Sequence, residues 1–137
     1  MTDEVAIRST RSDYELKLSS PKPPGLKQAV EYLQVSITGH DLSASSSEIY
    51  LYGAEHLAHF FEDLAANCKG WEGEKEWSSI EEDFKLTAST DRLGHIALKI
   101  KLRSGQYSQD WEVETGIDVD AGQIEQIAKE IKRFLRV

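Results

Sequence analysis

Acidic and aromatic side chains are concentrated in one short stretch, and this stretch holds the residue types best suited to recognising a partner. Residues 54–83 contain 9 acidic and 2 basic residues, a net charge of 2 − 9 = −7 within a total of −8. Carboxylates steer basic partners, and tryptophans are frequent hot spots of protein interfaces. We therefore predict a surface that binds a basic protein, and its candidate residues are Trp71, Glu72, Glu74, Glu76, Trp77 and Glu81.

Histidines offer an alternative chemistry, a pocket that binds or hydrolyses a small molecule. His56 and His59 precede Asp63 at helical spacing, and His95 ends the segment Asp91-Arg-Leu-Gly-His95. His59 and Asp63 on one helix face could supply two metal ligands. A zinc site normally takes at least three ligands from the protein, so these two do not complete one. The segment that ends at His95 also suits a tight hairpin, in which Asp91 caps the turn and Gly94 takes a positive φ. We therefore predict no metal and no cofactor, and keep these histidines as the alternative site.

The sequence contains no motif that favours an enzyme. The chain contains no P-loop, G-x-G-x-x-G, H-E-x-x-H, C-x-x-C or G-x-S-x-G pattern. Cys68 lies on the apolar stripe of a predicted helix, which is typical of a small buried side chain rather than a nucleophile. Trp71 and Trp77 either fold back over the sheet as a lid or project as the anchors of an interface.

Length, charge and cysteine usage bound the class of protein. A chain of 137 residues with a net charge of −8 predicts one domain, residues 1–137, that repels nucleic acid. A single cysteine excludes an internal disulfide and is typical of a reducing compartment. The N-terminus lacks the pattern of a signal peptide, and no run of about 18 apolar residues spans a membrane. We expect a cytoplasmic protein.

Hydropathy patterns predict the elements that position these residues. Alternation indicates short strands before residue 53 and again between residues 84 and 113, whereas two stripes at 3.6-residue spacing indicate helices at about 54–69 and 120–136. Asp120 with Gln123 forms a capping box that starts the second helix. We expect an α+β fold, a mostly antiparallel sheet with both helices on one face. The proline-rich segment 21–25 is predicted to be a loop.

Chain reversals and irregular segments follow from the same pattern. The inward parity changes across residues 45–47, which predicts a bulge. A two-residue turn at Ser104-Gly105 would place Leu98 opposite Trp111 and bury that indole. The stretch 71–83 has no period and is predicted to be a loop, and no internal repeat is visible.

Several of these elements together resemble a family of small bacterial proteins known only as a domain of unknown function. The elements are Phe60-Phe61, Gly70-Trp71-Glu72-Gly73, Gly94-His95-Ile96, Asp110-Trp111 and Ala121-Gly122-Gln123-Ile124. The resemblance covers about residues 30–137 and implies a bacterial cytosolic protein. It implies no activity, cofactor or catalytic residue.

A non-enzymatic protein-binding module is the function that the sequence favours. Its acidic face, residues 54–83, would bind a basic partner as small immunity or antitoxin proteins do, an analogy of size and charge. Two alternatives stay open: the pocket of His56, His59, Asp63 and His95, and a structural homodimer joined through a sheet edge.

Overall fold

A computed structural model describes residues 3–91, 93–104 and 110–137. Strands and helices follow one another in an order that is repeated once. The first half contains β1 (Glu4–Arg8), β2 (Glu15–Lys22), β3 (Tyr32–Gly39), β4 (Leu42–Tyr50) and α1 (Ala54–Ala66). The second half contains β5 (Lys75–Ser78), β6 (Phe84–Thr90), β7 (His95–Arg103), β8 (Glu112–Asp120) and α2 (Ala121–Leu135). The sequence shows no trace of this repetition.

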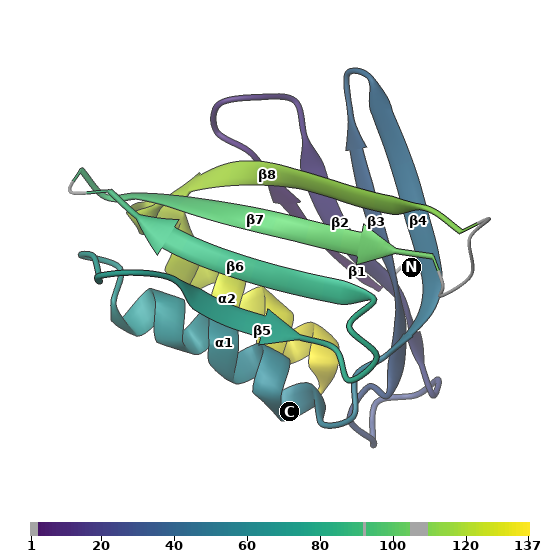
Figure 1. The fold of residues 1–137 in the computed structure, drawn as a ribbon. Coiled ribbons are helices and arrows are strands. Elements are labelled where there is room, and N and C mark those ends of the chain that lie inside the picture. The colour runs from purple at the N-terminus through teal and green to yellow at the C-terminus, as the bar shows by residue number, and fades with distance from the viewer. Residues whose placement is uncertain (1–2, 92, 105–109) are drawn as a thin grey trace.

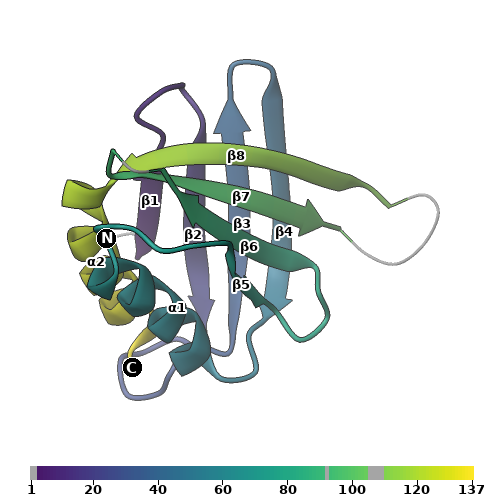
Figure 2. The same ribbon diagram turned by 60° about the vertical axis from the view of Figure 1, so that its left-hand side comes forward.

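Each half forms its own antiparallel four-stranded sheet, with strand orders β1-β2-β3-β4 and β5-β6-β7-β8. The strands of the second sheet cross those of the first, and α1 and α2 lie side by side against the second sheet (Figure 1, Figure 2). The α+β class, the antiparallel pairing and the two helices are confirmed. The single sheet is replaced by two because the chain leaves β4 through α1 instead of continuing the meander.

One apolar core joins the two sheets and the helices. The largest fully buried side chains include Phe61 of α1, Phe84 of β6 and Phe134 of α2. The capping box predicted at Asp120 and Gln123 is present, and α2 starts directly after β8. Arg136 donates from Nη1 to the Pro23 carbonyl oxygen at 2.6 Å, which ties the segment after β2 to the end of α2. The predicted loop 21–25 is shorter than expected, because β2 continues through Pro21 and Lys22. Within the described ranges, no helix is long and apolar enough to cross a membrane.

The first sheet contains the predicted bulge and a second one. Residues 33 and 35 of β3 pair with Ile49 and Ser46 of β4, so the register shifts in the region that the parity change indicated. β2 shifts similarly between Ser19 and Lys22. Pro21 lies inside that irregularity, which is where a strand tolerates proline.

The second sheet corrects two predictions. The β7–β8 register places Leu98 opposite Ile117, not Trp111. Where β7 connects to β8, the Ser104 backbone N–H donates to the Trp111 carbonyl oxygen at 3.0 Å, and the Trp111 backbone N–H donates to Ser104 Oγ at 3.1 Å. Gly105 of the predicted turn lies outside the described residues. Alternation identified the correct inward parity, but it fixes only the face and not the partner, so a slip by six residues keeps the pattern intact. Trp111 precedes the strand and is 37% exposed rather than buried.

The acidic stretch 71–83 is not wholly irregular. Residues Lys75–Ser78 form β5, an edge strand that pairs with β6 and places Trp77 opposite Leu86. Four residues are too few to show a period, which explains why the sequence did not reveal this strand.

Candidate functional site

The outer face of the second sheet contains a hollow of about 710 Å³. Its floor is low because Ala97 of β7 and Gly116 of β8, an edge strand, carry little or no side chain. Thr87 and Ser89 of β6 continue the floor, whereas Glu74, Lys99, Glu114 and Asp118 stand around it. The register explains the shape, since Ser89, Ala97 and Asp118 form one row across three strands.

Carboxylates dominate the rim of this hollow. Glu74, Glu114 and Asp118 face one ammonium group, Lys99, which lies 3.8 Å from Glu114. Glu74 and Asp118 form no ion pair with any residue that the structure describes. The rim therefore has an excess of two negative charges, located at its Glu74–Asp118 end, and favours a cation.

A smaller hollow of about 190 Å³ continues the same face towards the other end of the sheet. Here lysines and glutamates alternate: Lys85 lies 3.8 Å from Glu76, and Lys101 lies 3.8 Å from Glu112. These pairs are exposed, so each contributes only about 0–1 kcal/mol to stability. Their charges balance, which leaves the larger hollow as the uncompensated part of the face.

The predicted rim glutamates are divided by β5. Glu74 lines both hollows and Glu76 only the smaller one, while Glu72 is exposed just before the strand. Glu81 lies beyond the other end of β5, where its backbone oxygen accepts a hydrogen bond from Arg103 Nη2 at 2.9 Å. The structure therefore gathers Glu72, Glu74 and Glu76 and separates Glu81 from them.

The two predicted anchor tryptophans are half-buried and pack against the core. Trp77 makes an edge-on contact with Phe84, with ring centroids 5.4 Å apart. Lys75 Nζ lies 5.6 Å from the Trp71 ring centroid and 2.8 Å from the Asp63 carboxylate, so it covers that indole. Both rings hold the acidic segment on the body of the protein, which matches the lid interpretation.

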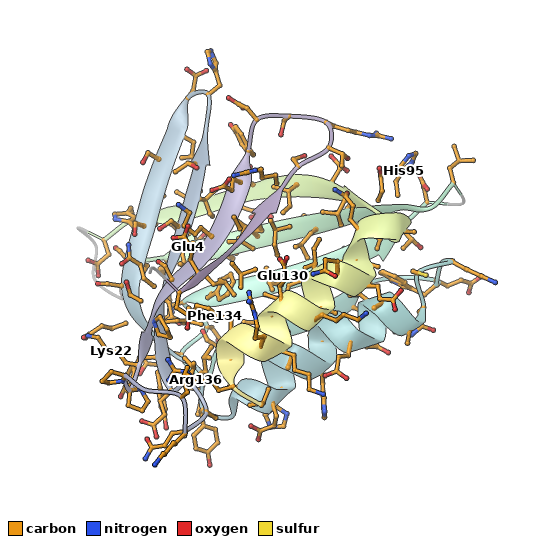
Figure 3. All side chains as sticks on the ribbon, turned by 180° about the vertical axis from the view of Figure 1, so that it is seen from behind. Glu4, Lys22, His95, Glu130, Phe134 and Arg136 are labelled. Carbon is orange, nitrogen blue, oxygen red and sulfur yellow. The ribbon has the colours of Figure 1, made fainter. Side chains whose placement is uncertain are left out.

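The histidines are distributed over two elements. His56 and His59 are exposed on α1, and Asp63 is engaged by Lys75 and by Asn67 Nδ2 at 3.1 Å. His95 lies at the start of β7. Figure 3 shows it on the side of the molecule opposite to Lys22. Among the described residues, the side chain of His95 contacts Asp91 and Arg11 and not the α1 residues, and no cluster of three metal-ligating side chains is present.

A family model matches residues 7–137, nearly the whole chain. The chain belongs to DUF6228, a family of unknown function. No curated protein matches it. Among solved structures, a crystal structure of MRP1/MRP2 from Trypanosoma brucei has a TM-score of 0.49 at 11% identity and covers 98% of this chain and 83% of that chain. That similarity is too low to inform on function.

Asp91 in this DUF6228 chain forms the hairpin cap that the sequence predicted. Its Oδ1 accepts the backbone N–H groups of Leu93 at 2.7 Å and His95 at 3.0 Å, and its Oδ2 lies 2.8 Å from His95 Nδ1. Gly94 takes a φ of 84° as expected. The hydrogen bonds from the His95 backbone and side chain lower the pKa of Asp91 from 3.8 to about 2.

Replacing Asp91 by asparagine is expected to destabilise the protein at pH 7 more than at pH 3. Because the folded-state pKa is lowered, the carboxylate stabilises the fold fully above about pH 4 and loses this effect as the pH falls through about 2. At pH 3 the pH-dependent part of the difference should be roughly half of its value at pH 7. Thermal unfolding followed by circular dichroism measures this, and a difference independent of pH would contradict it.

His95→Ala is the matched variant for this experiment. It removes the 2.8 Å contact with Oδ2 but keeps the backbone N–H of residue 95. We expect it to show a smaller pH-dependent difference than Asp91→Asn, because the backbone hydrogen bond from residue 95, which lowers the pKa of Asp91 most, survives.

Sequence reasoning missed part of each surface in this DUF6228 chain. Asp118 and Gly116 join the larger hollow only through the β7–β8 register, which the sequence did not supply. The tyrosines Tyr32, Tyr50 and Tyr52 were also missed, although they form a continuous exposed group. Tyr50 and Tyr52 are two residues apart after the predicted bulge. This spacing was the signal that would have indicated that both tyrosines lie on the same outward face.

Proposed function

We propose that this protein is a non-enzymatic binding module that receives a basic segment of a partner protein on the outer face of its second sheet. The observation that carries the proposal is the hollow in which Glu74 and Asp118 lack cationic partners among the described residues while Ala97 and Gly116 keep the floor open. A lysine or arginine chain can lie with its apolar stem on such a floor and its charge at the rim.

Long-range electrostatics supports the same partner. The chain has a net charge of −8, and nearly all of the excess lies in residues 54–83. A field of this sign raises the association rate of a basic protein, and the rim charges then fix its orientation. A cytoplasmic module of the immunity or antitoxin type would combine these properties.

The half-buried tryptophans support this proposal in a role other than the predicted one. Thr90 Oγ1 accepts a hydrogen bond from the backbone N–H of Trp71 at 3.1 Å and donates one to the Trp71 carbonyl oxygen at 3.2 Å. The main chain before Glu72 is therefore fixed to β6. Trp77 similarly fixes β5 through Phe84. The acidic segment is therefore held in one place before a partner arrives, which lowers the ordering cost of binding.

Neutralising the rim is expected to weaken binding of a lysine octapeptide about tenfold, the equivalent of about 1.4 kcal/mol. The variant is Glu74→Gln, Glu114→Gln and Asp118→Asn, and isothermal titration at low ionic strength measures the affinity. The control is Glu4→Gln, Glu125→Gln and Glu130→Gln on other elements. Both triple variants change the net charge from −8 to −8 + 3 = −5.

The control variant distinguishes binding at the hollow from a general effect of the protein's net charge. If the hollow binds the peptide, the control loses less than about twofold. Equal losses in the two variants would show that the peptide senses only net charge, and the proposal would be wrong. Ala97→Leu adds a test of shape, because it fills the floor at an unchanged charge and should weaken binding as the triple variant does.

A further inference from the structure

A third hollow, of about 310 Å³, lies on the outer face of the first sheet between the two bulges. On one side β2 is irregular between Ser19 and Lys22, and on the other β4 is irregular between Ser46 and Ile49. β3 runs between them and contributes Tyr32 and Gln34 to the floor and wall. Bulges re-aim side chains and are frequent beside binding sites.

Backbone strain is concentrated at the same place. Five described residues other than glycine have a positive φ, and three of them belong to this region: Ser20 at 50°, Glu48 at 60° and Tyr52 at 44°. Ser20 and Glu48 line the hollow, and Tyr52 follows β4. A left-handed conformation is unfavourable for serine, glutamate and above all tyrosine, and such strain accumulates where function requires a fixed geometry.

Three tyrosines form one continuous wall beside the hollow. Tyr32 and Tyr50 are cross-strand partners with ring centroids 5.0 Å apart, and the Tyr52 ring lies 6.1 Å from that of Tyr50. Their neighbours Leu33, Ile49 and Leu51 are buried, so alternation turns the tyrosines outward; Tyr32 is 39% and Tyr52 65% exposed. Of the three rings, Tyr32 lines the hollow itself. The Tyr50 ring is tilted by 33° against that of Tyr32, and the Tyr52 ring by 60° against that of Tyr50, so the three form a stepped ledge of aromatic faces.

The polar groups around the ledge are paired donors and acceptors without net charge. Lys22 Nζ of β2 and Glu48 Oε1 of β4 are 3.0 Å apart, and the pair spans the central strand β3. Gln34 donates to Ser45 Oγ at 2.7 Å, which leaves its carbonyl oxygen as an acceptor. The hydroxyls of Ser20 and Ser47 complete the lining. Because Lys22 is already neutralised, a phosphate finds no free cation here.

We propose that this hollow binds a neutral saccharide, with one sugar ring stacked on the tyrosine ledge. A pyranose has an apolar C–H face that suits an aromatic ring, and its hydroxyl edge both donates and accepts hydrogen bonds. Gln34, Glu48, Lys22 and the serines offer both kinds of partner at that edge. The site lies on a different sheet from the acidic hollow and does not depend on it.

The test uses Tyr52→Gly with three probes, cellohexaose, maltohexaose and chitohexaose, titrated into the full-length protein and followed by NMR amide shifts. We expect at least one probe to shift the signals of Gln34 and Ser47, and Tyr52→Gly to weaken its binding about tenfold. Glycine removes the ring and also relieves the φ of 44°, so the melting temperature should stay equal or rise. A loss of binding without a loss of stability identifies a functional ring.

Two further variants complete the test. Gln34→Leu keeps the size of the side chain and removes its acceptor, so it should weaken saccharide binding as well. Trp111→Ala removes an exposed aromatic ring just before β8, on the other sheet, and should leave saccharide binding unchanged. If none of the three probes binds, or if decaproline or a thymidine decanucleotide shifts the same signals instead, the proposal is overturned.

Discussion

Replacing Phe84 by alanine is expected to lower the free energy of unfolding by about 3–5 kcal/mol. Phe84 is fully buried at the start of β6, and its ring supports the Trp77 indole at 5.4 Å. The backbone hydrogen bonds between residues 79 and 84 do not involve the ring, so the cost comes from the cavity and the lost packing. Urea unfolding followed by circular dichroism measures the change.

The same variant links the core to the acidic hollow. Trp77 belongs to β5 and Glu74 immediately precedes that strand, so a cavity beneath Trp77 releases the segment that supplies the rim. We expect the tryptophan emission of Phe84→Ala to shift to longer wavelength and the lysine octapeptide to bind more weakly. Leu93→Ala is the control, because Leu93 is 81% exposed and its truncation should cost less than about 0.5 kcal/mol. A cost below about 1 kcal/mol for Phe84→Ala would contradict the packing described here.

Local signals in the sequence were sufficient for the helices and for most strands. The apolar stripe of Leu57, Phe61 and Leu64 predicted α1, and these residues are buried as the stripe requires. α1 ends at Ala66, three residues before the predicted end, because Asn67 leaves the helical conformation there. The capping box of α2 was predicted correctly because all of its parts lie within four residues.

Pairing between distant residues could not be obtained in the same way. Alternation fixes which face of a strand is buried, but every even shift satisfies it, so the β7–β8 register was wrong by six residues. Ile117 and Val119 then occupy the core positions that the sequence assigned to Trp111 and Val113. With the wrong register Asp118 could not be placed in the same row as Ser89 and Ala97, and of the three carboxylates around the larger hollow the sequence named Glu74 alone.

The two sheets use their outer faces for different chemistry. The outer face of the first sheet is rich in hydroxyl, amide and tyrosine groups around β3 and β4. The outer face of the second sheet carries mainly lysines and carboxylates. The inner faces are uniformly apolar and form one core. Stability explains the apolar inner faces, whereas it does not explain the strained tyrosine hollow and the uncompensated acidic hollow; our two proposals assign these to two ligands of different chemistry.

Replacing Gly39 by alanine is expected to destabilise the protein by about 1–3 kcal/mol. Gly39 ends β3, and a Cβ atom at this position would overlap the ring of Tyr14, which packs against the core. The φ of Gly39 lies outside the left-handed region, so the backbone itself accepts alanine. The whole cost should therefore come from the contact with Tyr14, and chemical denaturation measures it.

A double-mutant cycle isolates that contact. In a Tyr14→Ala background the overlap is gone, so adding Gly39→Ala should cost less than about 0.5 kcal/mol. Gly122→Ala is a matched control with the opposite sign: nothing lies within 4 Å of its added Cβ, and it is in α2, where alanine stabilises by up to about 1 kcal/mol. If Gly39→Ala costs the same with and without the Tyr14 ring, the strand end is constrained by its backbone and not by the aromatic side chain that covers it.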